Sequence, residues 1–120
     1  MEHAAYMPGL HILAEIKTED VDKLCDAHGF MSMIEVAIQD LQLKEVGRVV
    51  HAFDGAGFTA VVCLTESHLS IHTWPEYGHL TFDVFLSNFS RNNDNACRTL
   101  YEMVQTYFNP TSVKFSENRR

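Results

Sequence analysis

The sequence has few of the features that mark secreted or membrane-spanning proteins. Its 120 residues include only three cysteines, Cys25, Cys63 and Cys97. They are odd in number, widely spaced and without a C-x-x-C pair, so they indicate neither a disulfide framework nor a structural zinc site. No apolar run approaches the roughly 20 residues that cross a bilayer. Free thiols in a reducing compartment are the simpler interpretation.

Positive charge is also scarce. Lys and Arg total 9 against 16 Asp and Glu, for a net charge of −7. The only basic cluster is the terminal Arg119-Arg120, which argues against nucleic acid or an anionic membrane as the main partner. A small cationic ligand fits this charge better. Residues 1–6 (MEHAAY) lack the basic and apolar segments of a secretion signal, so we expect a cytoplasmic protein.

The size and composition are those of one globular domain. Apolar residues make up 46% and charged residues 21% of the chain, which is typical of a soluble folded protein. A protomer of 120 residues exposes much of its surface unless it pairs. We therefore expect a single domain over residues 1–120 that forms a homodimer.

Hydrophobic periodicity predicts more strands than helices. Two turns rich in Gly and Pro, at 54–57 and 75–78, separate alternating segments and predict two hairpins. Thr18 is predicted to cap a short helical turn that runs through Leu24. The predicted strands are 9–17, 45–53, 58–66, 68–74, 79–86 and a short last one at 112–115, and the predicted helices are 30–43 and 92–108.

These elements predict an α+β fold. The expected architecture is an antiparallel β-sheet with two helices packed on one face. The second face of such a sheet also needs cover, and a second copy of the chain can supply it. The predicted dimer is therefore an α/β/β/α sandwich.

Potential chemistry is concentrated in the segment from Glu66 to Gly78, ESHLSIHTWPEYG. His68 and His72 are four residues apart, a spacing that would make a zinc pair on a helix. The composition predicts a strand, in which the two rings would stand roughly 13 Å apart. No metal site is therefore expected.

Two other interpretations of the segment are weaker. A serine hydrolase could combine Ser67, a histidine and a carboxylate such as Asp83, but the chain has no G-x-S-x-G motif. In the simplest alternative Ser67 ends a strand, and His68 and His72 are half-buried polar residues. For an isolated Ser-His pair that alternative would be preferred.

The whole segment resembles the self-processing site of prokaryotic S-adenosylmethionine decarboxylases. The hallmark of that family is Glu-Ser-His followed by Ile-His-Thr-Trp-Pro-Glu, present here over residues 66–76. Weaker similarity covers most of the chain, including Gly9-Leu10-His11, the hairpin before residue 66 and residues 82–85 (FDVF).

The resemblance implies a proenzyme that cuts itself between Glu66 and Ser67. In the family the serine attacks the preceding carbonyl, here that of Glu66, and β-elimination then breaks the chain. The products would be fragments 1–66 and 67–120, the latter beginning with a pyruvoyl cofactor made from Ser67. The substrate amine forms a Schiff base with this group, which withdraws electrons as carbon dioxide leaves.

The resemblance also implies roles for other residues. His72 matches a histidine that moves protons during processing. Phe53 falls where an aromatic ring stacks on adenine, and Glu76 where a carboxylate binds the ribose hydroxyls. Taken alone, Phe53 would be a core aromatic residue and Glu76 a turn residue.

The chain departs from the family pattern at two positions. Thr59 stands where the family has a serine that assists processing, and it keeps the hydroxyl. Ser87 stands where the family has the cysteine that reprotonates the decarboxylated carbon. A thiol has a pKa of about 8.5, whereas a serine hydroxyl is a far weaker acid.

These features give three hypotheses. The first is decarboxylation of S-adenosylmethionine, which provides the aminopropyl donor for spermidine biosynthesis. The second, motivated by Ser87, is a pyruvoyl-dependent arginine or ornithine decarboxylase of the same family. The third is a non-catalytic homologue that remains uncut. The intact Glu66-Ser67-His68 sequence and His72 favour an enzyme.

Overall fold

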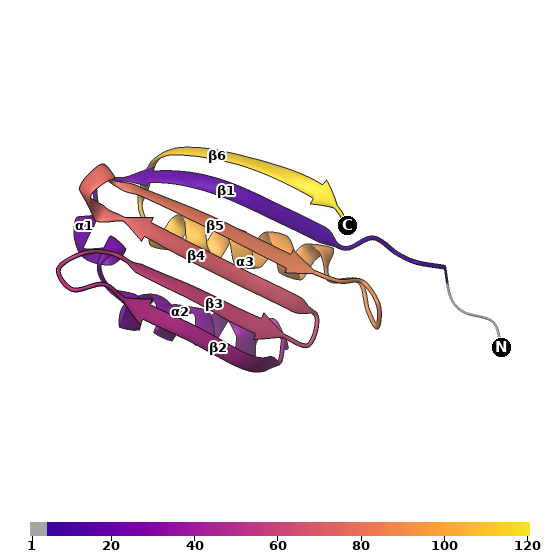
Figure 1. Ribbon diagram of the computed structural model, residues 1–120. Coiled ribbons are helices and arrows are strands. Elements are labelled where there is room, and N and C mark those ends of the chain that lie inside the picture. The colour runs from indigo at the N-terminus through magenta and orange to yellow at the C-terminus, as the bar shows by residue number, and fades with distance from the viewer. Residues whose placement is uncertain (1–4) are drawn as a thin grey trace.

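The computed structural model describes residues 5–120, which form an α+β fold around one antiparallel sheet (Figure 1). This confirms the predicted fold class. The sheet has six strands in the order β2-β3-β4-β5-β1-β6. Residues 1–4, part of the segment inspected for a secretion signal, lie outside the described residues. The elements are β1 (Leu10–Thr18), α1 (Val21–Leu24), α2 (Ala27–Asp40), β2 (Glu45–Ala52), β3 (Phe58–Leu64), β4 (Ser67–Trp74), the 3₁₀ helix η1 (Pro75–Tyr77), β5 (His79–Leu86), α3 (Asp94–Tyr107) and β6 (Pro110–Arg119).

The two long helices, α2 and α3, cover the same face of the sheet, as predicted (Figure 1). Strand alternation directs every second side chain toward them, and these apolar side chains form the core. Phe30 of α2 lies 5.7 Å from the ring of Phe58 and 5.9 Å from that of Phe108. Each fully buried ring of this kind contributes about 1.5–3 kcal/mol. No helix within residues 5–120 has the length and apolar character needed to span a membrane.

The opposite face of the sheet carries no helix, and we call it the open face. It mixes polar side chains with large apolar ones that remain exposed. Leu13 is 43% exposed, Val49 70% and Trp74 38%. An exposed apolar surface of this kind is typical of a site that contacts another molecule.

Most described helices and strands lie within two residues of the predicted boundaries, and the larger differences are at α2 and β6. The helix predicted at 30–43 is α2, three residues earlier, because the Asp26 carboxylate caps it by accepting a 2.8 Å hydrogen bond from the Gly29 amide. Gln42, with φ of 56°, stands just beyond its end. The predicted short strand at 112–115 was too short, because β6 pairs with β1 along its whole length.

The prediction that Thr18 caps a helix is wrong. Thr18 is a buried residue at the end of β1, and its hydroxyl donates a 2.6 Å hydrogen bond to the Phe108 carbonyl. The cap of α1 is Asp20, whose carboxylate accepts from the Lys23 amide at 3.2 Å. The Thr18 hydroxyl is therefore used to fasten the end of α3 to the sheet.

Candidate active site

The Glu66-Ser67 bond lies in the tight turn between β3 and β4, at the right-hand end of the sheet in Figure 1. The Thr65 amide fixes the turn by donating to the Lys44 carbonyl at 2.9 Å. Ser67 has φ of 134°, a conformation that favours glycine. Holding a serine there costs on the order of 1–3 kcal/mol. The backbone of the predicted nucleophile is therefore strained.

The carbonyl oxygen of Glu66 accepts a hydrogen bond from a backbone amide of the same chain. The backbone amide of Ser87 donates to the Glu66 carbonyl oxygen at 2.7 Å. Ser87 directly follows β5, and the neighbouring Leu86 pairs with Ser67 across the sheet. A donor in this position polarises the carbonyl and stabilises negative charge that develops on its oxygen during attack. The fold thus brings three predicted site residues, Glu66, Ser67 and Ser87, to one end of the sheet.

The side chain of Glu66 is held by groups that the sequence motif did not reveal. The Thr65 hydroxyl donates to Oε1 at 2.6 Å, and Arg91 and Asn93 donate to Oε2 at 3.1 and 3.3 Å. The Thr65 hydrogen bond and then Arg91 lower the pKa of the Glu66 carboxyl despite its partial burial. The carboxylate is therefore ionised and fixed beside the bond to be cut.

Thr59 and His72, both predicted to assist processing, contact each other. They are opposite one another on β3 and β4, with the Thr59 hydroxyl 3.0 Å from Nδ1 of His72. The His72 ring also lies 6.3 Å from that of Trp74, centre to centre. A hydroxyl bound to Nδ1 fixes the orientation of the imidazole and leaves Nε2 for proton transfer.

Phe53 and Glu76 lie at the same end of the sheet as this pair. Phe53 follows β2, is half exposed and packs against His51 at 4.6 Å between ring centres. Glu76 lies in η1, directly after β4, and is also exposed. Both side chains are accessible to a ligand, and neither belongs to the core.

The predicted site residues therefore form two groups at opposite ends of β4. His72 is five residues beyond Ser67 on an extended strand, roughly 16 Å away. Glu76 lies farther still, since the eight residues of β4 alone span roughly 23 Å. One chain brings Glu66, Ser67 and Ser87 together and, separately, Thr59 and His72. It does not bring the two groups into contact.

A third cluster on the open face was not predicted from the sequence. Asp83 Oδ2 lies 2.8 Å from Nε2 of His11 and 3.2 Å from Nε2 of His68, and the Ser70 hydroxyl donates to Oδ1. Burial would raise the pKa of Asp83, but the hydrogen bonds from Ser70, His11 and His68 lower it below its usual value. His11 lies on β1, Asp83 on β5, and His68 and Ser70 on β4. These three strands are neighbours in the sheet, so strand pairing alone brings the four side chains together on the open face.

The cluster contains the kinds of groups that bind metals. His11, His68 and Asp83 place their possible ligand atoms within 4.8 Å of one another. Within residues 5–120 this is the one group of three His, Cys, Asp or Glu side chains that lie so close together. A divalent ion could use these atoms. The Asp83 carboxylate, however, already has hydrogen-bond partners on both oxygens, so the positions of these side chains are explained without an ion. Asp83 binds these two histidines rather than His72, which gives no support to a hydrolase triad.

The buried cysteine, Cys97, is not suited to replace the missing thiol at position 87. Cys97 is buried under β1, with Sγ 3.4 Å from the Leu10 carbonyl oxygen, and burial raises its pKa to about 12. Such a thiol is a poor proton donor at neutral pH. Cys63 lies on β3 and is exposed.

Comparisons with known proteins identify the family. The S-adenosylmethionine decarboxylase family matches residues 10–120. An S-adenosylmethionine decarboxylase proenzyme from Picrophilus torridus is 31% identical over 93% of this chain and 83% of its own length. One from Archaeoglobus fulgidus is 32% identical over 88% and 91%.

A solved structure shows the same fold. The crystal structure of the adenosylmethionine decarboxylase from Aquifex aeolicus superposes with a TM-score of 0.85 at 31% identity. The alignment covers 97% of this chain and 92% of that one. The match in sequence thus extends through the whole sheet and both long helices. The chain belongs to the S-adenosylmethionine decarboxylase family.

Proposed function

We propose that this chain is a self-cleaving, pyruvoyl-dependent decarboxylase of S-adenosylmethionine. Its product would be the decarboxylated aminopropyl donor of spermidine biosynthesis. The observation that carries the proposal is the hydrogen bond from the Ser87 amide to the Glu66 carbonyl, beside a strained Ser67. The curated relatives, named as proenzymes, support it. The cytoplasmic location stays a prediction.

The proposed cleavage uses Ser67 as the nucleophile. Its Oγ attacks the Glu66 carbonyl carbon and gives a tetrahedral oxyanion. The C–N bond then breaks as the Ser67 nitrogen takes up the proton that the hydroxyl has lost, which converts the amide to an ester. Loss of the Ser67 α-proton then expels Glu66 as a carboxylate, giving fragments 1–66 and 67–120. Water hydrolyses the new amino-terminal enamine to a pyruvoyl group and releases ammonia. The Ser87 amide would stabilise the oxyanion of the first step.

The residues around Ser67 fit such a group. It would start β4 beside Ser87, at the end of the sheet rather than in the core. When formed, the pyruvoyl group supplies an electron sink for the pair released with carbon dioxide. Ser87 would stand nearest the substrate carbon that must be reprotonated. Because its hydroxyl is a weak acid, we expect slow or incomplete protonation there.

We also propose that two chains complete each site. Pairing of two open faces about a two-fold axis would bring the Ser67 end of one chain to the Glu76 end of its partner. The exposed Leu13, Val49 and Trp74 support such an interface. Each site would then contain Ser67 and Ser87 from one chain.

The second chain of the dimer would contribute the remaining groups. Thr59 and His72 would move the proton required for elimination, as an imidazole does near neutral pH. Phe53 would stack on the adenine and Glu76 would accept hydrogen bonds from the ribose hydroxyls. The exposure of both side chains in the single chain supports these roles.

The intact mass of the purified protein tests the cleavage. We expect two fragments that match 1–66 and a pyruvoyl-blocked 67–120, and a single chain for Ser67→Ala. Carbon dioxide release from S-adenosylmethionine, arginine and ornithine then tests the substrate. Release from arginine or ornithine alone would contradict the proposed substrate, and an uncut wild-type chain would indicate a non-catalytic homologue.

Co-expression of two inactive variants tests the shared site. Ser67→Ala and His72→Ala should each stay uncut or nearly so when made alone. A mixed dimer has one complete site, formed by Ser67 of the second variant and His72 of the first. We therefore expect cleavage of the His72→Ala chain to return on co-expression. If it stays uncut in verified mixed dimers, the site does not cross between chains.

A further inference from the structure

We propose that Arg91 and Asn93 are positioning residues for self-cleavage. In our interpretation they hold Glu66 against Ser87 before the cut and retain the new carboxyl terminus after it. We call this pair the Glu66 clamp. The inference rests on the proposed cleavage between Glu66 and Ser67. It adds two residues that no part of the sequence motif contains.

Asn93 connects the two segments that meet at the cut. Its side-chain amide donates to the Ser87 carbonyl oxygen at 2.8 Å and to Oε2 of Glu66 at 3.3 Å. The residue is only 1% exposed. A buried amide with two such acceptors fixes their relative position, because breaking either hydrogen bond leaves a buried polar group without a partner.

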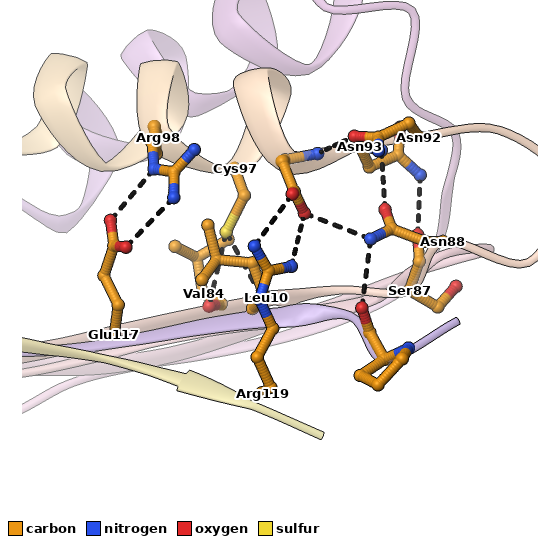
Figure 2. Close-up of polar contacts among 12 residues, drawn as sticks. Leu10, Val84, Ser87, Asn88, Asn92, Asn93, Cys97, Arg98, Glu117 and Arg119 are labelled. Atoms are coloured by element: carbon orange, nitrogen blue, oxygen red, sulfur yellow. Dashed lines mark hydrogen bonds and ion pairs between the residues drawn. The ribbon is translucent and has the colours of Figure 1, made fainter. Parts of the chain in front are cut away.

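The clamp is itself anchored by a network at the start of α3 (Figure 2). The backbone amide of Asn93 donates to Oδ1 of Asn88 at 2.7 Å. The Asn88 side chain donates to the Pro8 carbonyl at 3.1 Å and to Oδ1 of Asp94 at 3.0 Å. Arg119 then binds both carboxylate oxygens of Asp94. The loop after β5 is thus tied by hydrogen bonds to the segment before β1 and, through Asp94, to β6.

Arg91 links the two future fragments. Its Nη2 donates to the Gln42 carbonyl at 2.8 Å and to Oε2 of Glu66 at 3.1 Å, and it lies 3.4 Å from the Leu41 carbonyl oxygen. All three acceptors belong to fragment 1–66, whereas Arg91 belongs to 67–120. One guanidinium therefore joins the end of α2, the residue before the cut and the loop beyond β5.

Two physical effects follow from this arrangement. Before cleavage, fixing Glu66 keeps its carbonyl on the Ser87 amide and prevents the turn from relaxing the φ of Ser67. Attack by Oγ then starts from a restricted geometry, which favours reaction. After cleavage, Glu66 carries a second carboxylate, and the nearby charge of Arg91 offsets it through charge-assisted hydrogen bonds.

The rate of cleavage in freshly synthesised chains tests the first effect. Cell-free translation, followed by a timed chase and denaturing electrophoresis, measures the uncut fraction. We expect Arg91→Ala to slow cleavage at least tenfold and Arg91→Lys to slow it less. The matched control is Arg98→Ala, which removes a similarly exposed arginine from its ion pair with Glu117 on β6. It should cleave at the wild-type rate.

Asn93→Asp provides an independent variant of the same size. It replaces the donor with a carboxylate facing Glu66, so we expect it to cleave more slowly than Arg91→Ala. A wild-type rate for both variants would overturn the clamp while leaving the proposed function intact. An uncut wild-type chain would overturn the proposed function and the clamp together.

Urea unfolding distinguishes positioning from general stabilisation. In the uncut Ser67→Ala chain, Arg91→Ala should shift the unfolding midpoint only slightly. In the cleaved protein the same change should lower the midpoint more, because the cut end has gained a carboxylate. Equal shifts in the two backgrounds would show that Arg91 has no role in retaining the new terminus.

Discussion

The backbone amide of Ser87 and the carbonyl oxygen of Glu66 are 2.7 Å apart and form a hydrogen bond. The contact joins the end of β5 to the turn before β4, across twenty-one residues of sequence. It places the position of the family's proton donor against the bond that the proenzyme is proposed to cut. Cleavage and the later decarboxylation would therefore share one end of the sheet.

Ser87→Cys should improve the enzyme. A thiol with a pKa of about 8.5 donates a proton to the substrate carbon far more readily than a serine hydroxyl does. We expect at least a tenfold rise in the number of turnovers completed before inactivation. Product formed per active site measures this number. An unchanged value would mean that position 87 does not protonate the substrate.

Thr59→Val should slow cleavage without changing the fold. The substitution is nearly isosteric but removes the hydroxyl that lies 3.0 Å from Nδ1 of His72. Without it the imidazole loses its fixed orientation, and we expect cleavage to slow by about 10–100-fold. Thr59→Ser, which keeps the hydroxyl, should cleave normally. The time course of the uncut fraction provides the measurement.

Thr73→Val should destabilise the protein. The buried Thr73 hydroxyl donates to the Leu24 carbonyl at 2.6 Å and accepts from the Phe58 amide at 2.9 Å. Valine leaves both backbone groups without that partner, at a cost of about 1–3 kcal/mol. Urea unfolding of the uncut Ser67→Ala chain at fixed concentration measures the change. Thr111→Val, at an exposed position of β6, should have little effect.

The Asp94–Arg119 pair should contribute an acid-sensitive part of the stability. Hydrogen bonds from Arg119 and Asn88 lower the pKa of Asp94 from 3.8 to about 2. Because the folded pKa is depressed, the stabilisation is complete above pH 3.8 and is lost as the pH falls toward 2.

Unfolding midpoints measured from pH 5 to pH 2 test this contribution. The wild-type protein should exceed Asp94→Asn at pH 5, and the difference should shrink as the pH falls. Asp40→Asn, at the exposed end of α2, is the control and should show no such trend. A difference that stays constant over the range would mean that the charge of Asp94 contributes nothing.

Local patterns determined most of the secondary structure. Alternation predicted β4 and β5 at almost their described bounds, and Gly78, with φ of 57°, ends the turn that joins them. The length of β6 could not be read from the sequence, because its exposed outer residues show little alternation. Its length comes from pairing with β1, and the paired residues of the two strands are about a hundred residues apart in the sequence.

The sequence by itself determined the family and the bond proposed for cleavage, because the segment 66–76 carries Glu66, Ser67, His72 and Glu76 in one run. The other proposed residues, Phe53, Thr59 and Ser87, followed from their alignment with the same family pattern. Only the tertiary structure decided how these residues are grouped. An extended strand separates Ser67 from His72, whereas pairing of β4 with β5 brings Glu66 to Ser87. Arg91 and Asn93 join Glu66 through a segment whose position depends on contacts with the turn after α2, with Pro8 before β1 and with Arg119 of β6. Such contacts between distant segments leave no periodic signal in the sequence.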